Sequence, residues 1–321
     1  MENRGILSPN EAEKSAELLK RIGEELNKIL LGHEELHRMV LIGILCRGHI
    51  LLEGLPGVGK TMLVKALGQL MDLGFKRVQF TPDLLPGDIL GSNILQETPE
   101  GQREMVFQPG PVFTNILLAD EINRSTPKTQ SALLEAMEER QVTIDGETRQ
   151  LPAPFFVIAT QNPQSQSGTY ALPESQLDRF LMRIELGYPD AGAERQMLEQ
   201  GDSRPAIESL PLCLDREQLS ALQNRVEQVR ASAALLDYVQ RLVEYSRSAP
   251  DFTYGLSPRA SLALLQAARA WALLQKRNHV VPEDVQAVLP AVATHRLMAA
   301  GGVQSSGQAL VVQMLDSVDV V

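Results

Sequence analysis

The segment GLPGVGKT, residues 54–61, combines the residue types that proteins use to hold a phosphate group. In its pattern, glycines bring backbone N–H groups to phosphate oxygens, a lysine reaches the β- and γ-phosphates, and a threonine hydroxyl serves Mg²⁺. An incidental glycine turn is the alternative, but an apolar run precedes the segment and apolar residues at helical spacing follow it. We therefore predict a nucleotide site, with contacts from Gly54, Pro56, Gly57, Val58, Gly59, Lys60, Thr61 and Met62.

Two acids, Asp120 and Glu121, follow the apolar run NILLA. Open parallel sheets bind ligands beyond the carboxyl ends of their strands, which would place both carboxylates beside the phosphate loop. We expect Asp120 to hold Mg²⁺ through water, together with Thr61, and Glu121 to polarise the attacking water. Capping of the following helix is the alternative. A second acid favours hydrolysis over a nucleotide-held switch, and without an Asn-Lys-x-Asp signature for guanine the expected nucleotide is ATP.

Asn162 follows another apolar run, FFVIAT, and precedes Pro163. Because the middle strands of such a sheet end at one rim, its amide could approach the γ-phosphate and orient the attacking water. An asparagine before a proline is also a good turn former. Both interpretations of Asn162 stay open at the level of sequence.

Strands must position these groups, and five near-continuous apolar runs are candidates: residues 49–53, 77–80, 115–120, 154–160 and 180–186. Such runs are typical of parallel strands that helices cover on both faces. Ser8 and Glu11 form a capping-box pattern at the start of an N-terminal helix. After Pro189 the strand patterns stop and helical patterns follow. We predict an α/β core with a parallel sheet at residues 1–188, an all-helical lid domain at residues 189–300 and a tail at residues 301–321.

Composition narrows the class of protein. The chain of 321 residues has 44% hydrophobic residues, as a globular protein does, and a net charge of −10, which counts against nucleic acid as a partner. Its two cysteines, Cys46 and Cys213, lack metal-ligand spacing, and the chain shows neither a signal-peptide pattern nor an uncharged apolar run of about 18 residues. We expect a cytoplasmic protein without membrane insertion.

Six motifs in the order found here are similar to those of MoxR-type AAA+ ATPases of the helix-2-insert clade: GLPGVGKT, FTPDLLPGDILGS, LLADEINRSTPKTQSALLEAMEERQVTIDG, FFVIATQNP, GTYALPESQLDRF and LSPRA. The resemblance spans about residues 30–260. It implies an AAA+ P-loop NTPase core with five strands. It also implies a ring, usually a hexamer, with ATP at the subunit boundaries.

The resemblance also implies roles for three arginines. Arg179 matches the arginine finger, which reaches the γ-phosphate bound by a neighbouring subunit, and a local ion pair with Asp178 is its alternative. Arg259 matches the second sensor arginine. Its positive charge at the start of a helix that Ser257 caps would be relieved by an anion, from its own or a neighbouring nucleotide. Arg124 could face the subunit boundary or form a structural salt bridge.

Three further segments take their interpretation from the resemblance. Gly32 and His33, in LLGHEE, match the segment beside the adenine, although many relatives carry Gln where His33 stands, and a surface role for His33 is the alternative. Residues 80–113 resemble the clade's insertion, with TPEG as a hairpin tip. Residues 141–151 carry an Asp-Gly hairpin signal. Both hairpins would point toward the pore of the ring, or would be surface hairpins without a partner.

The expected function is Mg²⁺-dependent hydrolysis of ATP by a ring that remodels, matures or inserts a cofactor into client proteins, in the manner of a chaperone. The resemblance suggests a von Willebrand factor A domain protein as a further partner. A nucleic-acid-directed motor, which stimulation by DNA would indicate, and an ATP-dependent scaffold with little turnover are the alternatives.

Overall fold

A five-stranded parallel sheet forms the centre of the computed structural model, which describes residues 7–54, 57–97, 102–162, 168–201, 207–300 and 307–320. The strand order is β2-β5-β8-β1-β9, and every neighbouring pair is parallel. The strands are β1 (His49–Gly54), β2 (Phe75–Gln79), β5 (Ile116–Asp120), β8 (Phe156–Gln161) and β9 (Phe180–Leu186). The prediction of a five-stranded parallel α/β core is confirmed.

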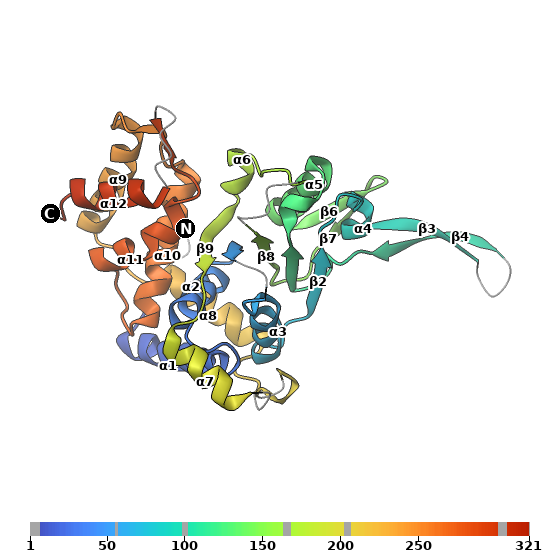
Figure 1. Cartoon of the computed structure of the whole chain (residues 1–321), viewed down its shortest axis with the longest axis horizontal. Coiled ribbons are helices and arrows are strands. Elements are labelled where there is room, and N and C mark those ends of the chain that lie inside the picture. Colours follow the sequence, from blue (N-terminus) through green and yellow to red (C-terminus); the bar gives the residue numbers. More distant parts are fainter. Residues whose placement is uncertain are drawn as a thin grey trace.

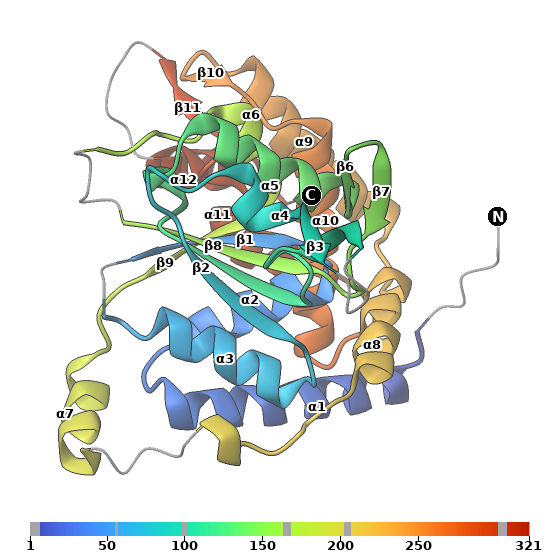
Figure 2. The same cartoon turned by 90° about the vertical axis from the view of Figure 1, so that its right-hand side faces the viewer.

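Helices cover both faces of this sheet, as its apolar runs require (Figure 2). Along β1, Ile50 and Leu52 pack into one apolar core and Leu51 into another, because successive side chains point to opposite faces. The first core contains α1 (Pro9–Ile29), α2 (Glu34–Leu45) and α3 (Lys60–Leu70), and the second contains α4 (Pro86–Leu90), α5 (Pro127–Glu139) and α6 (Glu174–Leu177). The carboxyl end of the sheet is left for a ligand.

The capping box at the N-terminus is present in the structure. Ser8 Oγ accepts from the backbone N–H of Glu11 at 3.3 Å, and the Glu11 carboxylate accepts from the N–H of Ser8 at 3.1 Å. These bonds satisfy two of the donors that a helix leaves unpaired at its start. The predicted start of the first helix is confirmed.

Helices dominate the part of the chain beyond residue 190. They are α7 (Ala191–Gln200), α8 (Arg216–Gln228), α9 (Ala233–Ser248), α10 (Pro258–Leu274), α11 (Pro282–Ala293) and α12 (Gly307–Ser317), with a short 3-10 turn, η2 (Ile207–Ser209). Helices α9 to α12 form the left side of the molecule in Figure 1. One small departure from an all-helical lid is a two-stranded sheet of β10 (Phe252–Tyr254) and β11 (Met298–Ala299). Because α1 packs against α10 in a continuous core, a domain boundary at residue 188 stays a prediction.

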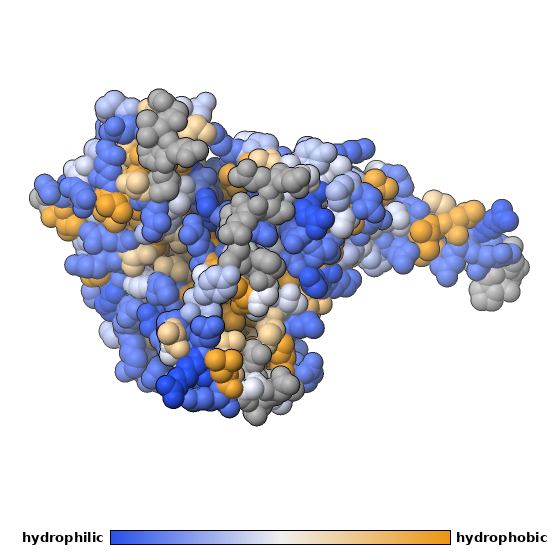
Figure 3. All heavy atoms as spheres, in the orientation of Figure 1, coloured by the Kyte–Doolittle hydropathy of each residue, from blue (hydrophilic) through white to orange (hydrophobic). Residues whose placement is uncertain are grey.

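Two hairpins leave the core. β3 (Gly91–Glu97) and β4 (Arg103–Pro109) form an antiparallel ribbon that projects far from the body (Figure 1), and the expected tip at residues 98–101 lies outside the described residues. Apolar side chains gather on this ribbon (Figure 3), with Leu95 59% and Met105 60% exposed. The second hairpin joins β6 (Gln141–Ile144) to β7 (Glu147–Gln150). Its turn has positive φ at Asp145 and Gly146, as an Asp-Gly turn predicts.

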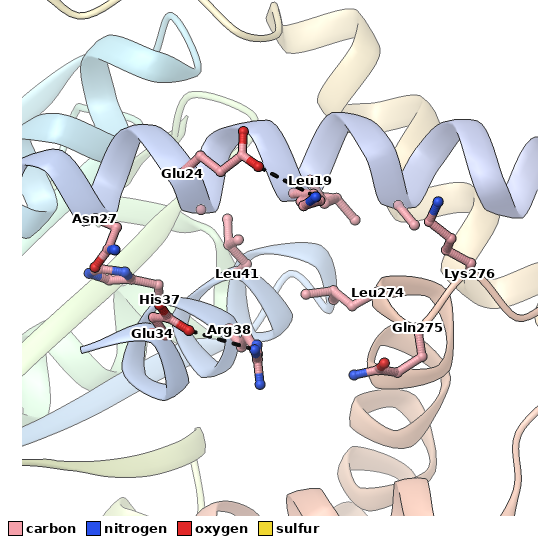
Figure 4. Close-up of a pocket in the computed structure, with 13 residues that line it drawn as sticks. Leu19, Glu24, Asn27, Glu34, His37, Arg38, Leu41, Leu274, Gln275 and Lys276 are labelled. Atoms are coloured by element: carbon pink, nitrogen blue, oxygen red, sulfur yellow. Dashed lines mark ion pairs between the residues drawn. The ribbon is translucent and has the colours of Figure 1, made fainter. Parts of the chain in front are cut away.

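A hollow of about 430 Å³ lies between α1, α2 and the end of α10. Figure 4 shows Asn27 beside the ring of His37, which is 1% exposed and has no hydrogen-bond partner among the described residues for either ring nitrogen. Burial lowers the pKa of His37 to about 4, so the ring is neutral at physiological pH. None of the described residues of the phosphate loop, Gly54 and residues 57–61, lines this hollow, so it is distinct from the nucleotide site described below.

Candidate active site

The phosphate loop leaves β1 at Gly54 and enters α3 at Lys60, which is the expected strand–loop–helix arrangement. Gly57 and Gly59 have φ values of 84° and 94°, a region that side chains with a Cβ rarely adopt. A Cβ on Gly59 would also lie 2.6 Å from Leu30 Cδ1, whereas one on Gly57 would meet open space. Pro56, a predicted contact, lies outside the described residues.

Lys60 turns back onto its own loop. Its Nζ donates to the carbonyl oxygen of Gly54 at 2.5 Å. Burial lowers the pKa of Lys60, and the charges of Asp120 and Glu121 oppose that shift. The Lys60 ammonium therefore lies between the loop and the two acids. Its positive charge would attract a phosphate bound there.

The two acids are held by a threonine that the sequence interpretation missed. Thr160, at the end of β8, donates from Oγ1 to Asp120 Oδ1 at 2.6 Å and accepts from the Glu121 backbone N–H at 2.9 Å. Glu121 has a left-handed backbone with φ 56°, a conformation that residues other than glycine rarely adopt. A hydroxyl in an otherwise apolar run, FFVIAT, was the signal that could have identified Thr160.

Strand β2 supplies two more polar groups that the sequence interpretation missed. Arg77 Nη2 donates to Asp120 Oδ2 at 2.6 Å, and Gln79 Nε2 donates to Glu121 Oε2 at 3.0 Å. Arg124, in the 3-10 turn η1 (Ile122–Arg124), donates to Glu121 Oε2 at 2.8 Å, so it forms a salt bridge within the subunit. Arg77 and Gln79 lie two residues apart and hence on one face of β2. Without knowledge of the strand order, this spacing is only a weak sign that they belong to the site.

A cavity of about 340 Å³ joins these groups. Asn162 lines it, so the structure brings the amide to the rim where the acids end. The lining residues are Gly57, Gly59, Lys60, Thr61, Met62, Arg77, Gln79, Asp120, Glu121 and Asn162. The cavity thus contains the groups that ATP hydrolysis needs. It has donors for phosphate, a hydroxyl and a carboxylate suited to Mg²⁺, and a second carboxylate next to them.

Gly32 and His33 do not line that cavity and lie at the junction with α7. A Cβ on Gly32, whose φ is 75°, would lie 2.5 Å from Ala193 Cβ. His33 is 9% exposed, so a surface role for it is wrong, and burial lowers its pKa while the charge of Asp190 opposes the shift. The structure therefore places both residues where the core meets the first lid helix.

Arg179 and Arg259 meet on a single carboxylate that the sequence interpretation missed. Arg179 Nε lies 3.0 Å from Glu138 Oε2, and Arg259 Nη2 donates to Glu138 Oε1. The alternative of a local pair with Asp178 is wrong, because Asp178 Oδ1 accepts from Arg296 Nε at 2.7 Å and from Ser257 Oγ at 3.2 Å. Arg296 is 4% exposed and also donates to the carbonyl oxygen of Phe180 at 2.6 Å. It therefore holds both neighbours of Arg179 in the sequence, Asp178 and Phe180.

This arginine pair lies at the opposite end of the sheet from the phosphate loop. Arg179 directly precedes β9, where Phe180 pairs with His49, the first residue of β1, whereas the loop follows Gly54, its last residue. The five steps from His49 to Gly54 along β1, at about 3.3 Å each, separate the two ends by about 17 Å. That gap is larger than an arginine side chain spans.

His49 marks the arginine end of β1. Its Nδ1 accepts from the N–H of Val157 at 3.0 Å and its Nε2 donates to the carbonyl of Met137, also at 3.0 Å, which only a neutral ring can do in this pairing. Burial lowers the pKa of His49 to about 4. The ring thus ties β1 to β8 and to the residue before Glu138.

Known proteins share this architecture. The family model "ATPase family associated with various cellular activities (AAA)" matches residues 49–182, and the "AAA lid domain" model matches residues 244–312. The chain is 47% identical to the uncharacterized protein YeaC of Bacillus subtilis, over 88% of this chain and 87% of that protein. It is 43% identical to chaperone MoxR1 of Mycobacterium tuberculosis, over 87% of this chain and 75% of that protein.

A solved structure agrees with the sequence relatives. A crystal structure from Cytophaga hutchinsonii, assigned as an ATPase, superposes with a TM-score of 0.88 at 37% identity and covers 97% of both chains. Fold and site together define an AAA+ ATPase with a helical lid. The chain belongs to the MoxR family of these enzymes, which confirms the resemblance seen in the motifs and the expected ATPase activity. Among the described helices, none is both long and apolar enough to cross a membrane.

Proposed function

We propose that this chain hydrolyses ATP with Mg²⁺ at the boundary between two copies of itself and uses the cycle to remodel client proteins. The observation that carries the proposal is the separation of the two groups of site residues along β1. The phosphate loop and acids lie at one end, and Arg179 with Arg259 lies at the other. A complete site, with an arginine near the γ-phosphate, therefore calls for a second subunit.

Within one subunit, the loop from Gly54 to Met62 would hold the phosphates, and Lys60 would exchange its bond to Gly54 for the β- and γ-phosphates. Thr61 and Asp120 fit Mg²⁺, because they line one cavity and this ion keeps several waters and few protein ligands. When bound, the ion neutralises charge on the phosphates. Gly32 and His33 would lie beside the adenine.

Glu121 and Asn162 would act on the attacking water. Glu121 would accept its proton and Asn162 would orient it, since both line the cavity beside Lys60. In this structure Arg124 and Gln79 hold the Glu121 carboxylate. Turnover would require Glu121 to exchange one of these bonds for water, which is a local rearrangement of exposed side chains.

Arg179 and Arg259 would act on the nucleotide of the neighbouring subunit. Their shared carboxylate, Glu138, places them on one surface, so the lid arginine would serve the neighbour's nucleotide together with the finger. Guanidinium groups there stabilise the charge that develops on the transferred phosphoryl group.

Mixing of two inactive variants tests this arrangement. Arg179→Ala should abolish phosphate release but leave ATP binding by the subunit intact, and Lys60→Ala should lose productive binding. Their mixture should recover activity, because some boundaries then combine an intact loop with an intact arginine. Arg195→Ala controls for the loss of an arginine elsewhere on the surface, since Arg195 lies on α7, is 82% exposed and pairs with Glu199. A correctly assembled mixture without activity would overturn the proposal.

The client and the assembly are further parts of the proposal. A chaperone-like role is supported by the 43% identity to a protein named chaperone MoxR1. We propose a cytoplasmic ring, with six subunits as the expected number, a von Willebrand factor A domain partner, and the β3–β4 and β6–β7 hairpins facing the pore. Affinity capture with ATP-loaded Glu121→Gln tests the partner, and the mass of the assembly in solution tests the ring. A monomer at all protein concentrations with ATP would contradict the ring.

A further inference from the structure

Glu138 joins three segments that are distant in sequence. It occupies the last turn of α5 and bonds through separate oxygens to Arg179, which precedes β9, and to Arg259, in the first turn of α10. The two arginines therefore share one counterion instead of having one each. Donation by Arg259 lowers the pKa of Glu138, and the nearby charge of Arg179 lowers it further, so the carboxylate is ionised at neutral pH.

The surroundings of this bridge carry surplus positive charge. A hollow of about 210 Å³ is lined by five arginines and two carboxylates: Arg47, Arg140, Arg179, Arg259 and Arg296, with Glu138 and Asp178. Asp178 is bonded to Arg296, and Arg47 pairs with Glu227 outside the hollow at 3.1 Å. Glu138 thus faces two arginines with a third, Arg140, lining the same hollow. Such a surface attracts an anion.

A terminal phosphate would compete with Glu138 for the same donors. It carries more negative charge and more acceptor oxygens than a carboxylate, and arginine binds both groups through the same planar fork. The carboxylate and the phosphate would repel each other if both stayed on the pair. The side chains of Glu138, Arg179 and Arg259 are 33%, 30% and 49% exposed, so a partner can reach the bridge and solvent weakens it.

We infer that Glu138 is an internal stand-in for the neighbour's γ-phosphate, occupying Arg179 and Arg259 in the free subunit and releasing them when a nucleotide-loaded neighbour docks. The inference rests on the proposed function of these arginines in trans. It adds Glu138 as a group that competes with the phosphate for the two arginines. This competition raises the free energy needed to form the active boundary and makes the arginines unavailable to other anions.

The rate of phosphate release as a function of protein concentration tests the inference. In Glu138→Gln no charged bridge has to be broken on docking, so the protein concentration at half-maximal rate should fall on the order of five-fold, the value expected for two partly exposed ion pairs. The rate per subunit at saturation should stay near that of the wild type. Glu139→Gln removes the same charge from the same helix turn without breaking either bridge and should not shift the midpoint.

A second variant guards against loss of folding, which thermal unfolding detects. Glu138→Asp keeps the charge but is too short to reach both arginines, so its midpoint should shift in the same direction by less. In an Arg259→Ala background one bridge is already absent. Because Arg259 would itself act on the nucleotide, the midpoint is there read from the mass of the assembly in solution with ATP, and Glu138→Gln should shift it only about two-fold.

Two outcomes would overturn the inference. Folded Glu138 variants with an unchanged or higher midpoint would show that no competing bridge is broken on docking. A saturating rate that falls with the midpoint unchanged would make Glu138 a positioning residue inside the working site. Failure of the proposed function is distinguishable, because it would appear as a loss of recovery in the mixture of Arg179→Ala and Lys60→Ala.

Discussion

Thr160→Val should both destabilise the chain and slow ATP hydrolysis. Thr160 is fully buried, and its hydroxyl donates to Asp120 Oδ1 and accepts from the backbone N–H of Glu121. Valine keeps the shape of the side chain and removes both bonds. The two acids would then lose the group that fixes them relative to β8.

The magnitude follows from these two bonds. A hydrogen bond to a charged group contributes about 1.5–3 kcal/mol, and an unsatisfied buried donor costs about 1–3 kcal/mol. Arg77 still holds the other oxygen of Asp120, so the lower parts of these ranges apply, and we expect a loss of about 3 kcal/mol in the free energy of unfolding. Misplacement of the acids by about 1 Å would lower the rate roughly 100-fold.

Phosphate release at saturating ATP and denaturant unfolding of the same preparations measure the two effects. Thr160→Ser is the matched control, because it keeps the hydroxyl and should retain most of the rate and of the stability. A Thr160→Val protein with wild-type rate and unfolding midpoint would refute the reasoning. So would a Thr160→Ser protein as impaired as the valine variant.

Three further perturbations follow from the geometry. Gly59→Ala should abolish nucleotide binding and cost at least about 2 kcal/mol, since φ is 94° and the new Cβ would lie 2.6 Å from Leu30 Cδ1; unaltered binding of a fluorescent ATP analogue would contradict this. Arg296→Met should lower the unfolding free energy by about 3 kcal/mol or more, because the carboxylate of Asp178 loses its charged partner and the carbonyl groups that Arg296 holds lose a donor. A neutral effect in urea unfolding would argue against this role of Arg296. His49 has its pKa lowered to about 4 from 6.5, so the unfolded chain binds one more proton between these values and stability is lost as pH falls through that window. His49→Asn, although less stable, should therefore show a slope of unfolding free energy against pH smaller by about 1.4 kcal/mol per pH unit, and equal slopes would disprove this assignment.

The sequence predicted those features that depend on local pattern. The run at residues 180–186 became β9 with the same bounds, and Ser8 with Glu11 formed the expected cap. The prediction of the strand ends carrying Asp120 and Asn162 also succeeded, because apolar runs followed by polar residues mark the exits of buried strands. These features need no knowledge of which strand lies beside which.

Partners across the sheet could not be predicted in this way. Arg77 reaches Asp120 because β2 lies beside β5, and Thr160 reaches it because β8 lies on the other side. Arg179 illustrates the same limit more sharply. Asp178 is adjacent in sequence and invited a pairing, yet consecutive residues point in different directions, and the actual partner, Glu138, comes from a helix 41 residues earlier.

Because the loop and the arginines lie at opposite ends of β1, the number of complete sites depends on how the subunits are assembled. With the two groups at different ends, subunits would associate head to tail. A single subunit would then own no complete site, an open row would own one fewer complete site than it has subunits, and only closure would give every subunit its own. The specific activity of a preparation would therefore measure its number of subunit boundaries with a complete site. Closing an open row into a ring would add one such site without adding protein.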